Sequence, residues 1–394
     1  MKIYNVTYND YALYLLVFSV TFENWNPFGL QGVFSITKMT TILYLISSLK
    51  VFSKRVSLRY MSYYTIPLLC YIATESISSI INIKYIQTFY DITSFKVLQL
   101  ILFMVLISNH LIEKPYLNIQ VLKIYVYSIA LLSFLFLMGI GIDSEYTDLT
   151  SRLSLFGENP NAIGVKGAIA LMIIFSLILE GKISLFLKVI FGFFSLAIIA
   201  LISGTASRGA FILVFLGGFT TVLLQKTTFK IKFLTIILAS FIGMLIWQYF
   251  LSNEVLLKRL METTEEGETG RNELWDAGMN IFYDNPILGV GRSGFLKEMN
   301  IYYGLPMDTH NIFIALLATT GIIGFLFFNL FFIRMWKHAF YNYKYSKSIL
   351  FLIILIIITF HMSKAGGILT QIFPWFIFSI VIGATRLSKQ LNYN

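Results

Sequence analysis

A histidine and two arginines stand beside polar turns in a chain that is otherwise strongly apolar. His310 and Asn311 begin a long apolar run, and Arg208 lies in a turn of a few residues between two other runs. Arg152 precedes an Asn-Pro-Asn stretch, ending at Asn161, that leads into a further apolar run. Guanidinium groups bind phosphates through paired hydrogen bonds, and a neutral imidazole can accept a proton from a hydroxyl. These residue types suit phosphate binding and general-base chemistry.

The composition indicates what kind of protein carries these groups. The 394 residues are 57% hydrophobic and only 13% charged, with a mean hydropathy of +0.75. Soluble proteins average about 25% charged residues, so most of this surface must face lipid. The net charge of +10 then reflects orientation in the membrane, and we expect no nucleic-acid partner. The one cysteine, Cys70, excludes a disulfide framework and a Cys/His metal cluster, and we expect no cofactor.

We predict an all-α, polytopic integral membrane protein with about twelve transmembrane helices. A spanning helix needs about 20 mostly apolar residues. The first apolar run is followed by Glu23-Asn-Trp-Asn-Pro27 and not by small residues, which indicates a retained anchor rather than a cleaved signal peptide. The predicted spans are 9–22, 32–50, 60–81, 91–109, 118–140, 161–180, 184–203, 207–225, 231–251, 311–333, 347–363 and 367–385.

Basic residues orient these spans, because cytoplasmic loops are enriched in lysine and arginine. With both termini inside, more than half of the 30 basic residues fall on the termini and the even-numbered connections. Those segments carry only Asp10, Glu113 and Glu180 as acids, and the odd-numbered connections are acidic. The sixth, eighth and tenth spans therefore begin at the outer face, where their unpaired N–H groups give partial positive charge.

Arg152, Arg208 and His310 each lie at or near one of these three outward N-termini. Two or three such helix ends beside arginines would suit a pyrophosphate. His310 would stay neutral there, because a helix N-terminus disfavours the imidazolium, and it could act as a general base. Asp308 or Thr309 could cap the helix that follows. Taken singly, each arginine could instead be an interfacial anchor, and the histidine could be a helix cap.

We divide the chain into three parts around one long outer segment. Residues 1–251 carry the first nine spans, residues 252–310 form the outer segment, and residues 311–394 carry the last three spans and a cytoplasmic C-terminus. Loops as long as the middle part are usually functional. We expect it to carry part of the active site.

The outer segment has helical patterning of its own. Apolar spacing predicts helices at 253–261 and 271–283, and Arg271 opens the second. Asp284-Asn-Pro286 should stop that helix, and Gly289–Gly294 is glycine-rich and predicts a flexible turn. We expect a small helical cap on the outer membrane surface.

Ionisable side chains inside predicted spans are costly and mark candidate functional positions. Lys38, Glu75, Asp91 and Lys96 are such residues. They could pair with one another or reach an interface, or they could contact a substrate. On an outer loop, Asp143-Ser-Glu145 could bind a metal, but a solvated acidic loop is the commoner explanation, so we expect no metal site.

A series of short motifs resembles the O-antigen ligase/polymerase superfamily. The resemblance covers roughly residues 150–330, and the order and spacing of the motifs carry it more than any one of them. The motifs are Asn159-Pro-Asn161, Ser207-Arg-Gly-Ala210, Gly270-Arg271 with Trp275, Asn285-Pro-Ile-Leu-Gly-Val-Gly291, and His310-Asn311 followed by Gly321-Ile-Ile-Gly324.

The resemblance implies a membrane glycosyltransferase of the GT-C type at the outer face of the bacterial inner membrane. Transfer would be metal-independent and inverting, from a glycan on undecaprenyl pyrophosphate. By position, Arg208 and Arg271 would hold the pyrophosphate, and His310 would deprotonate the acceptor hydroxyl or hold it for attack. The candidate substrate-binding set is completed by Arg152, Asn161 and Asn311. Ala318-Thr-Thr320 departs from the family, where many members have a glutamate before the glycine, so no partner carboxylate is assigned.

The resemblance leaves the acceptor open. A polymerase would transfer to the next lipid-linked repeat unit, and could bind a chain-length regulator; a ligase would transfer to a lipid A core sugar. The Ile-, Phe-, Tyr-, Lys- and Asn-rich composition suggests an AT-rich gene, which is common in polysaccharide clusters and favours the polymerase. A lipid-linked oligosaccharide flippase is a third reading, although transporters commonly show internal repeats and polar groups near the midplane.

Overall fold

The computed structural model describes residues 6–27, 29, 35–144, 152–181, 183–226, 228–265, 271–346 and 348–390. This part of the chain is helical, and its only β-type pairing consists of two isolated bridges around Leu155. The helices of the membrane body are α1 (Tyr8–Ser19), α2 (Ile36–Ser48), α3 (Phe52–Arg55), α4 (Ser62–Ile81), α5 (Phe95–Glu113), α6 (Leu117–Leu137), α8 (Pro160–Leu179), α9 (Leu185–Gly204), α10 (Arg208–Leu224), α11 (Phe229–Leu251), α15 (Ile312–Ser346), α16 (Leu350–Met362) and α17 (Ile372–Gln390).

The prediction of an all-α polytopic membrane protein is confirmed. Seven described helices are long and apolar enough to cross a membrane, namely α4, α5, α6, α8, α9, α11 and α15. The apolar helices α10, α16 and α17 are shorter. The first two predicted spans correspond to α1 and α2, which have 12 and 13 residues and fall below the length of a straight span. The count of twelve therefore stays a prediction.

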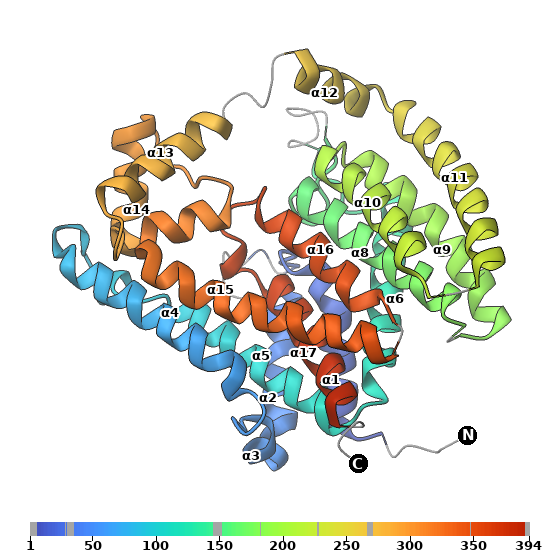
Figure 1. Cartoon of the computed structure of the whole chain (residues 1–394), viewed down its shortest axis with the longest axis horizontal. Coiled ribbons are helices and arrows are strands. Elements are labelled where there is room, and N and C mark those ends of the chain that lie inside the picture. The colour runs from blue at the N-terminus through green and yellow to red at the C-terminus, as the bar shows by residue number, and fades with distance from the viewer. Residues whose placement is uncertain are drawn as a thin grey trace.

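The helices differ in how far they are enclosed. α8 is the most enclosed candidate span, with 83% of its apolar window buried, whereas the window of α11 is only 6% buried. Figure 1 shows α11 at the edge of the molecule and α8 inside it. An apolar helix with an exposed surface is stable only against lipid, so α11 marks a lipid-facing side. The rest of the core is built by α4 against α15 and by α5 against α17.

α15 matches the predicted span 311–333 but contains a break that was not predicted. At Gly321 the chain has φ 58° and ψ −164°, a left-handed conformation that favours glycine. The N–H of Ile322 donates to the carbonyl of Pro286 at 2.9 Å, and a Cβ on Gly321 would collide with the carbonyl of Ile287. The helix opens because the backbone after Pro286 pairs with it. The sequence motifs Asn285–Gly291 and Gly321–Gly324 therefore meet in space.

The outer segment contains three helices, α12 (Glu254–Glu265), α13 (Arg271–Asp284) and α14 (Gly291–Tyr303). The first two confirm the predicted helices, and α13 ends at the predicted stop. The flexible turn predicted at 289–294 is wrong, because α14 begins within it. Gly294 lies inside α14, where the Tyr85 ring would lie 2.7 Å from an added Cβ. That glycine permits close packing rather than a loop.

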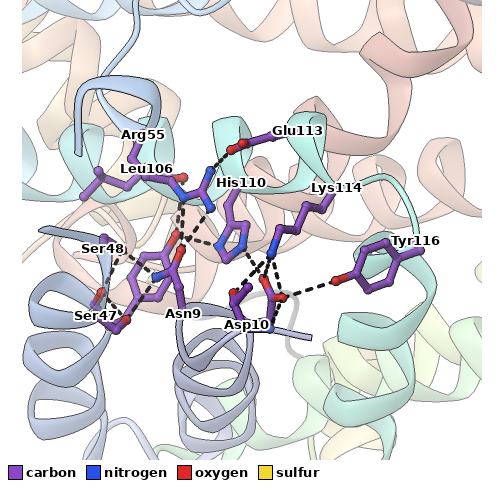
Figure 2. A network of polar contacts seen from close by, with 12 residues as sticks. Asn9, Asp10, Ser47, Ser48, Arg55, Leu106, His110, Glu113, Lys114 and Tyr116 are labelled. Carbon is purple, nitrogen blue, oxygen red and sulfur yellow. Dashed lines mark hydrogen bonds and ion pairs between the residues drawn. The ribbon is translucent and has the colours of Figure 1, made fainter. Parts of the chain in front are cut away.

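A buried polar network joins the N-terminus to α5 (Figure 2). Asp10, fully buried, accepts hydrogen bonds from His110 Nε2 at 2.8 Å and from Lys114 Nζ at 2.7 Å. Arg55 donates to Asn9 Oδ1 at 3.0 Å and pairs with Glu113. Buried charges need such partners, so the network holds α1 and α3 against α5.

Candidate functional site

Two of the predicted site residues, Arg152 and Asn161, are bonded to each other. Arg152 Nη2 donates to Asn161 Oδ1 at 2.8 Å, and Arg152 Nε donates to the carbonyl of Thr205 at 3.3 Å. Ser207 Oγ also donates to Asn161 Oδ1, at 3.1 Å. Asn161 lies in the first turn of α8, whose N-cap Asn159 accepts from the Asn161 N–H at 2.8 Å. The N-terminus of α8 is thereby tied to the turn before α10.

Two further polar side chains, those of Arg208 and Arg259, lie around that turn, residues 205–207. Arg208 is the first residue of α10, and its Nη1 donates to the carbonyl of Arg259 at 3.0 Å. Arg259 Nη1 donates in return to the carbonyl of Ala206 at 2.7 Å. Ala206 has φ 44°, a left-handed conformation that is uncommon for residues other than glycine. Strained backbone of this kind concentrates at functional sites.

We call Arg152, Arg208 and Arg259 the arginine cluster. The residues come from the segment before α8, from α10 and from α12. Arg152 and Arg259 donate to carbonyls of the 205–207 turn, and Arg208, which directly follows the turn, donates to the carbonyl of Arg259. Gly164 permits the close approach of α8 and α10, since an added Cβ would lie 2.5 Å from Ala210 Cβ. Two helix N-termini and three guanidinium groups then share one small region, which favours an anion.

Sequence reasoning missed Arg259. It lies on α12, which follows the expected helical pattern, but nothing in the pattern showed that α12 returns to the turn before α10. The return is made by Asn253, whose Nδ2 donates to the carbonyl of Ser203 at 2.9 Å. The neighbouring Leu256 is 1% exposed and anchors the helix in the core.

His310 lies in a second group, before the first turn of α15. It has φ 51°, and its backbone N–H donates to Asp308 Oδ1 at 2.8 Å. Asn311 is the residue that caps α15, because its Oδ1 accepts from the N–H of Phe313 at 3.1 Å. The expectation that Asp308 or Thr309 caps this helix is therefore wrong. Asp308 instead holds the backbone before α15, through its bond from the His310 N–H.

The connection between α16 and α17 closes over this group. Gly366 lies so close that an added Cβ would be 2.5 Å from Asp308 Oδ1 and 3.0 Å from His310 Nδ1. The Gly367 N–H donates to Asp308 Oδ2 at 3.3 Å. Lys364, in the same connection, places its Nζ 4.7 Å from the centre of the Trp275 ring on α13. Sequence reasoning missed Lys364 and Gly366, since nothing local links residues 364–367 to residue 310.

The predicted site residues thus divide into two groups. Arg152, Asn161 and Arg208 lie together at α8 and α10, and His310 lies with Asn311 at α15. Figure 1 shows α13 and α14 on one side of the molecule and α8, α10 and α12 on the other. Arg271 is the first residue of α13, and within the described part of the chain it makes no hydrogen bond to either group.

Comparison with known proteins bears on this arrangement. Residues 192–329 match a family model described as O-antigen ligase. The match supports the O-antigen ligase/polymerase superfamily. No curated protein matches the chain. The matched stretch runs from α9 into α15 and includes Arg208, Arg259, Arg271 and His310.

The match supports activity of the O-antigen ligase/polymerase type, carried out by an enzyme like a membrane glycosyltransferase. Arg152 and Asn161 lie outside the matched residues. Their bonds to each other and to the 205–207 turn are what join them to the matched part.

The ionisable residues of the predicted spans have varied surroundings. Glu75 accepts from the Ser94 N–H at 3.1 Å, and Asp91 accepts from the Thr88 N–H at 2.8 Å, so both carboxylates hold local backbone. Lys38 and Lys96 line one cavity together. Backbone contacts therefore account for the two carboxylates, whereas the two lysines are the candidates for substrate contact.

Metal ligands were expected to be absent. The described residues contain no group of three or more His, Cys, Asp or Glu side chains placed to hold a metal ion. Of the Asp143-Ser-Glu145 stretch, Glu145 lies outside the described residues.

Proposed function

We propose that this protein is a surface-polysaccharide polymerase. It transfers a glycan from undecaprenyl pyrophosphate to the non-reducing-end sugar of a lipid-linked repeat unit. The observation that carries the proposal is the arginine cluster, in which Arg152, Arg208 and Arg259 surround one turn at the N-termini of α8 and α10. Such a site suits the two phosphates of a leaving diphosphate, because charge develops there as the glycosidic bond breaks.

The reaction divides between the two groups. The acceptor hydroxyl oxygen forms a bond to the anomeric carbon as the bond from that carbon to the diphosphate oxygen breaks. His310 takes the hydroxyl proton, and the arginine cluster and Arg271 stabilise the charge that remains on the diphosphate. Attack opposite to the leaving group inverts the anomeric centre. The donor arrives activated, so the step needs neither ATP nor a metal.

The two asparagines have supporting roles in this scheme. Asn161 Oδ1 accepts from Arg152 and Ser207, and Asn311 Oδ1 accepts from the α15 backbone. Both are positioning residues: Asn161 directs a guanidinium toward the diphosphate, and Asn311 fixes the helix start that follows His310.

The site belongs on the outer face of the bacterial inner membrane, with both termini in the cytoplasm. The distribution of basic residues supports this orientation. A site at the water–lipid boundary would receive one substrate tethered in lipid and a sugar hydroxyl from water.

The test is transfer by the purified protein on a lipid-linked repeat unit alone, in detergent with EDTA. A ladder of longer glycans is expected from the wild type. Arg259→Ala should reduce the rate at least about 100-fold, the scale of losing a charge stabiliser in the transition state. Lys258→Ala is the matched control, because Lys258 is the exposed neighbour of Arg259 on α12 and should leave the rate unchanged. Equal rates in the wild type and Arg259→Ala would contradict the role of the cluster.

A ligase is the second candidate, favoured by the description of the matching family as O-antigen ligase. It shares the donor site and differs in the acceptor. Product that forms only when lipid A core is added would replace the polymerase by the ligase. A folded protein with no product on either acceptor would instead indicate a flippase. Loss of function on substitution of Lys38, Glu75 and Lys96, but not of His310, would indicate the same.

A further inference from the structure

A cavity of about 340 Å³ lies beside the α16–α17 connection. Its volume is within the range of small-ligand sites, about 300–1,000 Å³. It is lined by three charged side chains, Glu23, Lys38 and Lys96. The remaining lining residues, mostly with hydroxyl or amide groups, are Asn24, Asn26, Ser35, Thr370, Gln371 and Ile372. A wall of this composition offers many hydrogen-bond donors and acceptors.

The charges of the cavity favour an anion. Two lysines and one glutamate leave one positive charge. The carboxylate of Glu23 is already engaged, because it accepts from the N–H groups of Ile372 and Phe373 at the start of α17, the second at 3.1 Å. Glu23, Lys38 and Lys96 all line this one cavity, so a single ligand there can contact all three groups. Charge inside a membrane protein is costly, which favours a functional reason for both lysines.

A short stretch of the α16–α17 connection joins the cavity to the surroundings of His310. Gly366 and Gly367 contact the Asp308–His310 pair, and Thr370 lines the cavity. Three residues of chain, from 367 to 370, span about 10 Å at most. A saccharide of a few units could therefore place one sugar in the cavity and a neighbouring hydroxyl beside His310. The predicted topology also puts all of the lining residues at outer ends of spans.

We propose that this cavity binds an acidic sugar residue of the acceptor saccharide, with Lys38 and Lys96 on its carboxylate or phosphate and the amide and hydroxyl side chains on its hydroxyls. The proposal rests on the proposed function, since it names the acceptor for that same site. The cavity lining includes no residue of the arginine cluster, so donor diphosphate and acidic acceptor would bind to different cationic side chains.

The experiment measures binding rather than transfer. Glucuronate, glucose and inorganic pyrophosphate are titrated into the purified full chain in detergent, and saturation-transfer NMR reports each affinity. Glucuronate should bind more tightly than glucose. Lys38→Gln and Lys96→Gln should each weaken glucuronate at least about tenfold, the loss of one charge-assisted hydrogen bond. Lys50→Gln removes an exposed lysine elsewhere and should change nothing.

Glu23→Gln separates the proposal from a folding defect. It keeps an acceptor for the α17 backbone and removes the only carboxylate in the cavity wall, so it should tighten glucuronate about threefold or more. A misfolded variant could not gain affinity. Glucuronate binding that is absent in the wild type, or unchanged in both lysine variants, overturns the proposal. Displacement of glucuronate by pyrophosphate with the same lysine dependence would also overturn it, in favour of the carrier diphosphate.

The failures of the two proposals can be told apart. His310→Ala should lose transfer and keep glucuronate binding. Lysine-dependent binding in a chain that transfers nothing contradicts the proposed function alone. Transfer without any glucuronate binding contradicts the acceptor cavity alone.

Discussion

Arg152 and Asn161 are joined by a 2.8 Å hydrogen bond from the guanidinium to the side-chain oxygen at the start of α8. The bond links a residue outside the helices to the turn that carries Arg208, because Ser207 donates to the same oxygen. An asparagine there holds the arginine without neutralising it. The choice of an amide over a carboxylate is therefore significant for a site that must accept an anion.

Asn161→Asp should weaken binding of the lipid-linked donor. The substituted carboxylate keeps the acceptor oxygen and places a negative charge against Arg152, which lowers the attraction for a diphosphate. We expect KM for the lipid-linked donor to rise about tenfold, with a smaller change in kcat. Initial rates over a range of donor concentrations measure the split. Unchanged KM with a lowered kcat would show that Arg152 acts only after the donor is bound.

Gly366→Ala should disable the His310 group, because Gly366 lies in the α16–α17 connection that packs against this group. The new methyl group would lie 2.5 Å from Asp308 Oδ1 and 3.0 Å from His310 Nδ1, so the carboxylate, and with it the imidazole, must shift. Misplacement of about 1 Å can cost about 100-fold in rate. Gly218→Ala on α10 is the matched control, since no atom lies within 4 Å of its added Cβ. The transfer assay compares the two, and equal rates would mean that this glycine has no part in catalysis.

Local sequence patterns predicted where helices begin and end, but they missed contacts between segments that are far apart in the chain. Helix starts such as Arg208 and Arg271, and the stop after Asp284, follow from local spacing and turn chemistry. Arg152 and Asn161 were both placed at the start of one span, but the hydrogen bond between them was not predicted. Arg259 and Lys364 could not be found this way, because each reaches its partners across more than fifty residues or from a separate helix.

The break at Gly321 was missed for a related reason. Its apolar surroundings have the composition of a continuous span, and a single glycine inside such a run is usually tolerated. The break depends on backbone from residues 286–290, which pairs with the opened turn. Local pattern carries no information about a strand of backbone that arrives from the outer segment.

Gly321→Ala should therefore destabilise the fold. The left-handed φ of 58° costs a residue with a Cβ about 1–3 kcal/mol, and the collision with the carbonyl of Ile287 adds to that cost. Gly192→Ala, in α9 with no atom within 4 Å of its added Cβ, should be neutral or slightly stabilising. Thermal unfolding in detergent compares the two variants. A Gly321→Ala protein as stable as the Gly192→Ala protein would mean that the helix can close without penalty.

Asp10→Ala should reduce stability without altering the chemistry. The change leaves His110 and Lys114 without their shared carboxylate in the network of Figure 2. Breaking a buried pair by removing one partner costs about 3–5 kcal/mol. The folded fraction should keep the transfer rate of the wild type, because the network lies on the predicted cytoplasmic side. A folded variant with a rate below one tenth of the wild type would place the network in the mechanism instead.

Glu23 should give the fold an acid-dependent stability. Burial raises the pKa of Glu23 above its ordinary value, against the opposing effect of Lys166 and with a small further rise from Glu158. Lys38 and Lys96 face it from the cavity. Since the folded pKa lies above the unfolded one, the stabilising contribution is complete below about pH 4.5 and is lost as pH rises through the folded pKa. Thermal unfolding of the wild type should thus weaken over this interval relative to Glu23→Gln, which cannot titrate. Parallel pH profiles of the two proteins would show that the carboxyl titrates alike in both states, and that its bonds to the start of α17 offset the burial.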